Sequence, residues 1–214
     1  MNLIAALLTA FVAGAAAAAL NPFMRAQFET ETKLARSWLQ VPTAVVLGGL
    51  AGLAPTLIEQ VTFTLLAVAG ALLTVIDLGE YRLPDVIVLP LYPLLAALLT
   101  VAAWSQGHWA WLGRAGIMAV AMFVLYFVMA IFAPDLGFGD VKLGGVAGGF
   151  LGWFGVSQSL AGFLLAWVMM AVVGVVMIVA RRISSKASLP FGPYLILGAV
   201  VGVFAGPLMF PTFA

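Results

Sequence analysis

The chain has 214 residues, of which 64% are hydrophobic and only 8% are charged, with a formal net charge of +1. So few polar side chains cannot cover a soluble domain of this length, and apolar runs of about 18 residues or more recur along the chain. The composition predicts a polytopic membrane protein and excludes a basic nucleic-acid-binding surface. The absence of cysteine and the single histidine, His108, exclude disulfides, thiol chemistry and a metal cluster.

The apolar segments, taken in chain order, predict an all-α bundle of about eight transmembrane helices in a single domain, residues 1–214. The segments are 2–21, 38–56, 59–77, 86–104, 115–133, 141–155, 156–180 and 192–210. The first segment lacks the positively charged start of a signal peptide, so we expect it to be retained. The sixth segment is short and rich in glycine, which is typical of a half-length or tilted helix.

Glycine recurs at helical spacing in two of the last segments. The two series are Gly144, Gly148 and Gly152, and Gly198, Gly202 and Gly206. Small residues at this spacing let helix backbones approach closely in lipid. We therefore interpret both series as packing surfaces.

The basic residues predict the orientation of the chain in the membrane. With the N-terminus outside, the cytoplasmic loops hold every Lys and Arg except Arg114. Cytoplasmic loops carry an excess of basic residues, so this orientation is favoured. It places the loop of residues 22–37 in the cytoplasm and both termini outside.

Two aspartates deserve a functional explanation, because ionisable residues in membrane segments are costly and often mark function. Asp77 ends the third segment, where the negative end of the helix dipole disfavours an anion. Asp140 precedes the sixth segment, where an aspartate can also serve as a helix cap. Two segments separate them, so both are expected at the cytoplasmic face, where their carboxylates can meet.

The other acidic residues have simpler explanations. Asp85 follows Pro84 at the start of the fourth segment and is compatible with a helix cap alone. Charged side chains in the intervening loops are expected only to solvate them. These are Glu29, Glu31, Glu80 and Arg82.

Three motifs in this order resemble those of the type IV prepilin peptidases. DLGEYRLPD, residues 77–85, is similar to their first aspartate motif, and GFGDVK, residues 137–142, is similar to their second, G-x-G-D-x-K. LPFGPYLILGA, residues 189–199, resembles their C-terminal segment. Together the motifs extend the resemblance over roughly residues 60–205.

The resemblance implies a membrane aspartic protease that removes the basic leader from prepilin and pseudopilin precursors at the cytoplasmic face of the inner membrane. Asp77 and Asp140 would be its catalytic pair. Gly137 and Gly139 would shape the turn that presents Asp140. Lys142 and Asp85 would complete the substrate-binding residues. Anchoring by positive charge explains Lys142 equally well, and a helix cap is the favoured explanation of Asp85.

The chain departs from the longer bacterial members of that family in its first cytoplasmic loop. Those members carry paired CxxC motifs there that bind zinc, whereas this loop covers only residues 22–37 and contains no cysteine. They often also N-methylate the new terminus with S-adenosylmethionine. We expect a short form whose methyltransferase activity is in doubt and which needs no cofactor.

An aspartyl pair hydrolyses a peptide with one carboxylate as base and the other, protonated, as acid. The helix dipoles favour Asp140 as the ionised base and Asp77 as the acid. Pro84, Pro190 and Pro193 are expected to interrupt regular helix near the pair and to leave backbone free to bind an extended peptide.

Two other functions remain open at this point. Presenilin and signal peptide peptidase share the GxGD motif, but their first aspartate lies in a YD motif, whereas Ile76 precedes Asp77 here. A small proton-coupled transporter would show broken helices in pairs and symmetry between its halves, and neither pattern is clear in this sequence.

Overall fold

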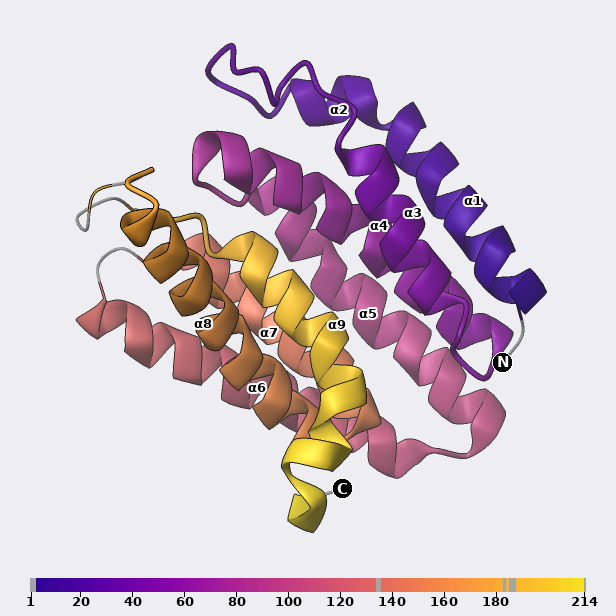
Figure 1. Cartoon of the computed structure of the whole chain (residues 1–214). Helices are drawn as coiled ribbons and strands as arrows, with labels where there is room; N and C mark the ends of the chain where they lie inside the picture. Colours follow the sequence, from indigo (N-terminus) through magenta and orange to yellow (C-terminus); the bar gives the residue numbers. More distant parts are fainter. Residues whose placement is uncertain (1–2, 134–135, 183, 185–187, 214) are drawn as a thin grey trace. The chain divides into compact units, whose positions relative to one another are not determined.

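The computed structural model describes residues 3–133, 136–182, 184 and 188–213, and within these ranges it is helical, with no strand (Figure 1). The chain divides into two compact units, Met1–His108 and Trp109–Ala214. Each unit is described by itself.

The first unit is built around the helix formed by Leu57–Glu80. Its elements are α1 (Leu3–Ala19), α2 (Asn21–Arg25), α3 (Gln40–Ala51), α4 (Leu57–Glu80) and α5 (Asp85–Gln106). Helix α4 packs against α1, α3 and α5, and nearly three quarters of its apolar stretch (72%) is buried. Small residues bring α1 and α3 together, since a Cβ atom at Gly14 would lie 2.6 Å from Val45 of α3.

Both ends of α4 have well-defined caps. Thr56 and Glu59 form a reciprocal capping box, in which the Glu59 N–H donates to the Thr56 hydroxyl over 3.4 Å and the Thr56 N–H donates to the Glu59 carboxylate over 3.2 Å. The helix ends where Tyr81 adopts a left-handed conformation at φ 55°. Residues 77–80 are therefore the last turn of α4.

The second unit consists of two helix pairs. Helix α6 (Trp109–Phe132) packs against α7 (Phe138–Phe154), and α8 (Val156–Val179) packs against α9 (Gly192–Met209), followed by the 3₁₀ turn η1 (Pro211–Phe213). Helix α7 also contacts both α8 and α9. It is therefore the central helix of this unit, as α4 is of the first.

The two glycine series pack the helices of the second unit, as their spacing predicted. Gly144, Gly148 and Gly152 face α6, and Gly198, Gly202 and Gly206 face α8. A Cβ atom at Gly152 would lie 2.9 Å from the Ala115 Cα, and one at Gly202 would lie 2.6 Å from the Gly162 Cα. The helix backbones therefore touch where a larger side chain would hold them apart.

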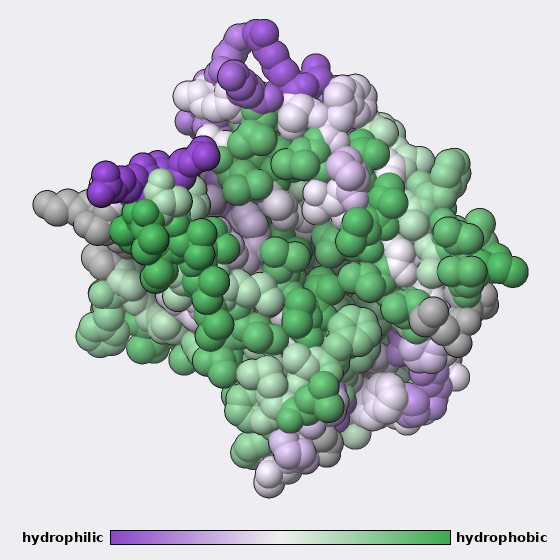
Figure 2. Space-filling view, viewed as in Figure 1, coloured by the Kyte–Doolittle hydropathy of each residue, from purple (hydrophilic) through white to green (hydrophobic). Residues whose placement is uncertain are grey.

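The helices confirm the expected class, a polytopic all-α membrane bundle. Within the part of the chain that the structure describes, five helices, α4, α5, α6, α8 and α9, are long and apolar enough to cross a membrane, while α1 and α3 are shorter apolar helices. Figure 2 shows apolar side chains over the helices and hydrophilic ones gathered over the loop between α2 and α3.

Each of the about eight predicted segments corresponds to a helix. Three of these helices, α1, α3 and α7, are shorter than a full span. Helix α3 has 12 residues, against the predicted 38–56, because the chain leaves the helix at Gly52 and turns before Pro55. Twelve residues rise about 18 Å, short of the bilayer core of about 30 Å. Helix α7 has 17 residues, in line with the short sixth segment.

Candidate active site

Asp77 lies in the last turn of α4 and is buried, with 3% of its surface exposed. Its carbonyl oxygen accepts a hydrogen bond of 2.9 Å from the Tyr81 N–H, which closes the helix. The carboxylate thus projects from a helix end whose dipole disfavours an anion, as the sequence predicted, and α4 continues for three residues beyond it.

Asp140 is the third residue of α7 and is also buried, with 8% of its surface exposed. Its Oδ2 accepts a hydrogen bond of 3.1 Å from the Gly137 N–H, which would otherwise be one of the unsatisfied donors at the helix start. The sequence placed Asp140 before the helix, whereas it lies inside the first turn. The helix begins at Phe138 because the Asp140 side chain reaches back to cap it.

Gly137 and Gly139 do not form a left-handed turn. Gly137 is the N-cap of α7 in extended backbone, φ −68° and ψ 149°, and Gly139 lies within the helix. The close approach of Asp140 explains the glycine at 137 better than backbone freedom does. A Cβ atom there would lie 3.3 Å from the Asp140 Oδ2, a tight contact.

Lys142 follows Asp140 on the same helix and is half-buried. Its Nζ lies 4.8 Å from the centroid of the Phe138 ring, within cation–π range. The Phe138 ring in turn makes edge contacts with Phe123 and Phe127 of α6, at centroid distances of 6.5 and 6.3 Å. These contacts fix the start of α7 against α6.

Asp85 is the first residue of α5 and is exposed, with Pro84 as the N-cap. A carboxylate in the first turn is favoured by the helix dipole, so helix stabilisation accounts for this residue. Within the first unit, Asp77 and Asp85 therefore flank the short connection from α4 to α5.

The PFGP part of the third motif is buried, and it leads into α9. The Phe191 ring contacts Trp167 and Tyr126, at centroid distances of 4.7 and 5.9 Å. The expectation that Pro193 interrupts the helix is wrong, because Pro193 lies in the first turn of α9, where its missing N–H has no helical partner to lose. Pro84 and Pro190 do precede their helices.

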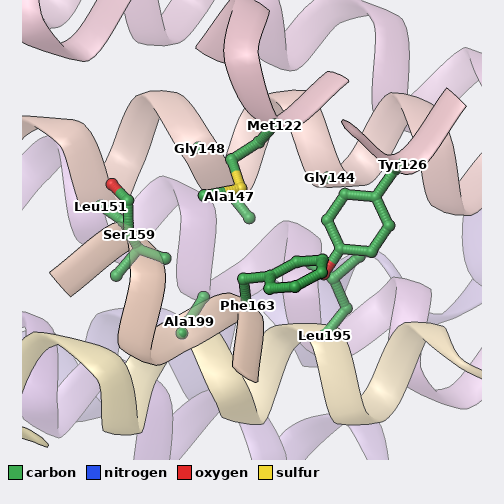
Figure 3. Close-up of a pocket in the computed structure, with 11 residues that line it drawn as sticks. Met122, Tyr126, Gly144, Ala147, Gly148, Leu151, Ser159, Phe163, Leu195 and Ala199 are labelled. Carbon is green, nitrogen blue, oxygen red and sulfur yellow. The ribbon is translucent and has the colours of Figure 1, made fainter. Parts of the chain in front are cut away.

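Tyr126 is the neighbour of Asp140 that the sequence did not single out. A Cβ atom on Gly144, one turn after Asp140, would overlap the Tyr126 ring. Figure 3 shows the ring between Gly144, Phe163 and Leu195, at the edge of a small pocket. Tyr126 is buried in the apolar run of α6, and such a position carries no sequence signal for function.

Among the described residues, no group of three or more His, Asp or Glu side chains is arranged to hold a metal ion. Three carboxylates of the described residues are buried: Asp77 of α4, Asp140 of α7 and Glu59, which caps the start of α4.

The fold and these buried carboxylates define a polytopic membrane protein with acidic groups at two helix ends. Residues 64–175 match the model of the type IV leader peptidase family. The chain is similar to a prepilin leader peptidase/N-methyltransferase of Burkholderia pseudomallei, with 34% identity over 169 residues, which cover 76% of this chain and 52% of that protein. The chain belongs to the type IV leader peptidase family.

Further relatives carry the same name. The protein of Pseudomonas aeruginosa is 31% identical over 147 residues, which cover 66% of this chain and 48% of that protein. The protein of Stutzerimonas stutzeri is 30% identical over 135 residues, which cover 63% and 46%. The chain thus spans about half the length of the curated relatives it matches, and no solved structure matches it.

Proposed function

We propose that this protein is a membrane-embedded aspartic endopeptidase that cleaves the basic leader from type IV prepilin-like precursors. The observation that carries the proposal is that the family match contains both motif aspartates, each of them buried at a helix end. Buried carboxylates are rare unless they are paired or functional.

In the proposed reaction, Asp77 and Asp140 share one proton because two close carboxylates do not readily both ionise. The ionised carboxylate takes a proton from water, and the water oxygen bonds to the scissile carbonyl carbon. The protonated carboxylate donates to the carbonyl oxygen. When the C–N bond breaks, a proton returns to the leaving amine.

We assign the base to Asp140 and the acid to Asp77. The Gly137 N–H and the positive end of the α7 dipole stabilise a negative charge on Asp140. Asp77 lies at the negative end of α4, where the neutral acid is favoured. Infrared spectra of the Asp77→Asn and Asp140→Asn proteins across pH test the assignment, which is wrong if the remaining Asp77 ionises at lower pH than the remaining Asp140.

We place the active site at the cytoplasmic face of the inner membrane, with both termini outside. Helices α5 and α6 have the length and composition of membrane spans, and two crossings by them would put the end of α4 and the start of α7 at the same face. The positive-inside rule assigns that face to the cytoplasm.

The proposed substrate is a precursor with a basic leader followed by an apolar helix, such as a prepilin or pseudopilin. Its helix would lie among the spans of the enzyme and its leader junction would reach the two aspartates. Gly137, Gly139, Lys142 and Asp85 would surround the scissile segment. An extended peptide would bind along the non-helical backbone before α9, at Pro190, whereas the Pro84 carbonyl oxygen already accepts hydrogen bonds from the Ile87 and Val88 N–H groups.

The test is cleavage of a co-expressed prepilin precursor by the wild type and by the Asp77→Asn and Asp140→Asn variants. Asparagine keeps the shape of the side chain and removes its acid–base function. The matched control is Glu31→Gln, on an exposed loop side chain. The proposal holds if the wild type and the control cleave after the leader and both aspartate variants insert but fail to cleave.

The proposed pair is wrong if either aspartate variant remains active. If the wild type cleaves no such precursor, the leader-peptidase function is wrong. Uptake of a labelled solute by proteoliposomes then tests the transporter, and cleavage of other membrane peptides tests a different GxGD protease.

A further inference from the structure

The loop between α2 and α3 is held against the last turn of α4, close to Asp77. The sequence analysis expected Glu29, Glu80 and Arg82 only to solvate exposed loops. That expectation is wrong, because all three side chains join the loop to the end of α4. We call residues 27–32 the docked loop.

Glu80 makes the first contact. One oxygen of its carboxylate accepts hydrogen bonds from both the N–H and the hydroxyl of Thr30, with 3.0 Å between the Thr30 nitrogen and that oxygen. A charged acceptor with two donors on one residue has a defined geometry, and hydrogen bonds to charged groups are about twice as strong as neutral ones.

Arg82 makes the second contact. Its guanidinium donates to the Gln27 carbonyl oxygen over 2.7 Å and forms an ion pair of 3.0 Å with Glu29. Arg82 thereby binds two positions of the docked loop, Gln27 and Glu29.

Gly79 makes the third contact, through shape. A Cβ atom at Gly79 would lie 2.5 Å from the Phe28 ring, so the aromatic side chain lies directly against the α4 backbone. Three of the five residues that follow Asp77 thus contact the docked loop.

The loop is also closed at its base. The Arg25 guanidinium reaches the Arg36 carbonyl oxygen at 3.4 Å, and the buried Asn21 amide reaches that of Ser37 at 3.5 Å. A compact loop whose ends are joined in this way can hold its own conformation. It can therefore act as a fixed support for the residues it contacts.

An exposed ion pair in the same loop provides a contrast. The side chains of Arg36 and Glu31 form an ion pair and are 73% and 85% exposed. Such pairs contribute little to stability. The Arg82–Glu29 pair is also exposed, at 42% and 72%. The contacts at Gly79, Glu80 and Arg82 differ from the Arg36–Glu31 pair because they join segments 50 or more residues apart at the end of the helix that carries Asp77.

We propose that the docked loop positions Asp77, and that Glu80 is the positioning residue through which it acts. The proposal rests on the proposed function. The last carbonyl groups of a helix lack partners and its last turn frays easily, so a carboxylate on that turn needs support from outside the helix. Misplacing a catalytic group by about 1 Å can cost about a hundredfold in rate.

The experiment compares Glu80→Ala, Glu80→Gln and Gly14→Ala in the full chain. Glu80→Ala removes the acceptor for Thr30, whereas Glu80→Gln keeps an acceptor oxygen. Gly14→Ala is the matched control, because its Cβ atom would collide with Val45 in the α1–α3 contact and lower stability far from Asp77. Thermal unfolding in detergent measures the folded fraction of each variant.

Two readouts follow. We expect Glu80→Ala to lower kcat per folded enzyme by about tenfold or more with KM unchanged, and Glu80→Gln to restore most of it. We expect hydrogen exchange of the 77–81 amides to quicken in Glu80→Ala and to stay at the wild-type rate in Gly14→Ala. Gly14→Ala should lower the unfolding temperature and leave kcat unchanged.

Positioning through Glu80 is overturned if Glu80→Ala keeps the wild-type kcat per folded enzyme, if its loss is no larger than that of Gly14→Ala, or if Glu80→Gln is no better than alanine. If the wild type cleaves no precursor, the proposed function fails and the positioning role fails with it. The exchange data then show separately whether the loop holds the last turn of α4.

Discussion

The end of α4 and the start of α7 each carry a buried aspartate, but the helix turns that carry them are held by different contacts. At the start of α7, the support is local, since Asp140 caps its own helix through Gly137, three residues away. At the end of α4, the contacts come from the docked loop, about fifty residues earlier in the chain. A helix start can organise a carboxylate with its own free N–H groups, whereas a helix end has only free carbonyl oxygens, which cannot donate to a carboxylate.

The two helices also differ in how they pack. Helix α4 begins with a complete capping box and is surrounded by α1, α3 and α5. Helix α7 begins with half of such a box, because Gly137 has no side chain, and its glycines lie against α6. Changes at α7 are therefore expected to act through backbone contacts.

The largest expected effect comes from the aspartates themselves. Asp77→Asn and Asp140→Asn should each lower cleavage by about 10²–10⁴-fold, the range for losing a general acid or base. Asp140→Ala should in addition cost about 0.5–2 kcal/mol of stability, because the cap on Gly137 is lost, whereas Asn keeps an acceptor. Thermal unfolding compares the stabilities of Asp140→Ala and Asp140→Asn. Equal stability of these two variants would contradict the helix cap.

The next largest effect is expected in the α6–α7 contact. A Cβ atom in Gly148→Ala would overlap the Met118 carbonyl oxygen, and forcing these backbones apart should cost about 1–3 kcal/mol. The matched control is Gly116→Ala on α6, where an added Cβ atom would meet nothing within 4 Å beyond its own helix backbone and chain neighbours. The control should be neutral or stabilising, because alanine favours a helix more than glycine does. Equal unfolding temperatures for the two variants would contradict the close packing.

A smaller effect is expected at the far end of α7. The Arg114 guanidinium donates to the carbonyl oxygens of Gly152 and Trp153, both over 2.7 Å, and so satisfies two acceptors of the last turn. Arg114→Ala should cost about 1–2 kcal/mol, and Arg114→Lys should recover part of it, because a lysine lacks the planar fork. Arg36→Ala, in an exposed ion pair, is the control and should change the unfolding temperature little.

The smallest expected change in stability is at the cap of α7. Gly137→Ser would supply the hydroxyl that Thr56 supplies to α4, and should alter stability by only a few tenths of a kcal/mol. Its Cβ atom would lie 3.3 Å from the Asp140 Oδ2 and would displace that carboxylate. Cleavage should fall while the unfolding temperature stays the same. Full activity of this variant would show that the close approach of Gly137 does not matter.

Much of the fold could be predicted from the sequence, because a helix that crosses a bilayer needs a long run of apolar residues and closely packed helices need small residues at regular spacing. Apolar runs locate the helices of both units, and glycine spacing identifies the contacts of α7 and α9 correctly. Helix lengths were less predictable. The early end of α3 at Gly52 depends on a turn that hydropathy does not register.

The sequence by itself determined the class of protein, the family and the two candidate aspartates, because motif residues and apolar periodicity are local properties. The tertiary structure decided how the surroundings are built. It placed Tyr126 against Gly144 and bound Thr30 to Glu80, contacts between residues 18 and 50 positions apart. No local pattern encodes such contacts, because they depend on which helix ends and loops the folded chain brings together.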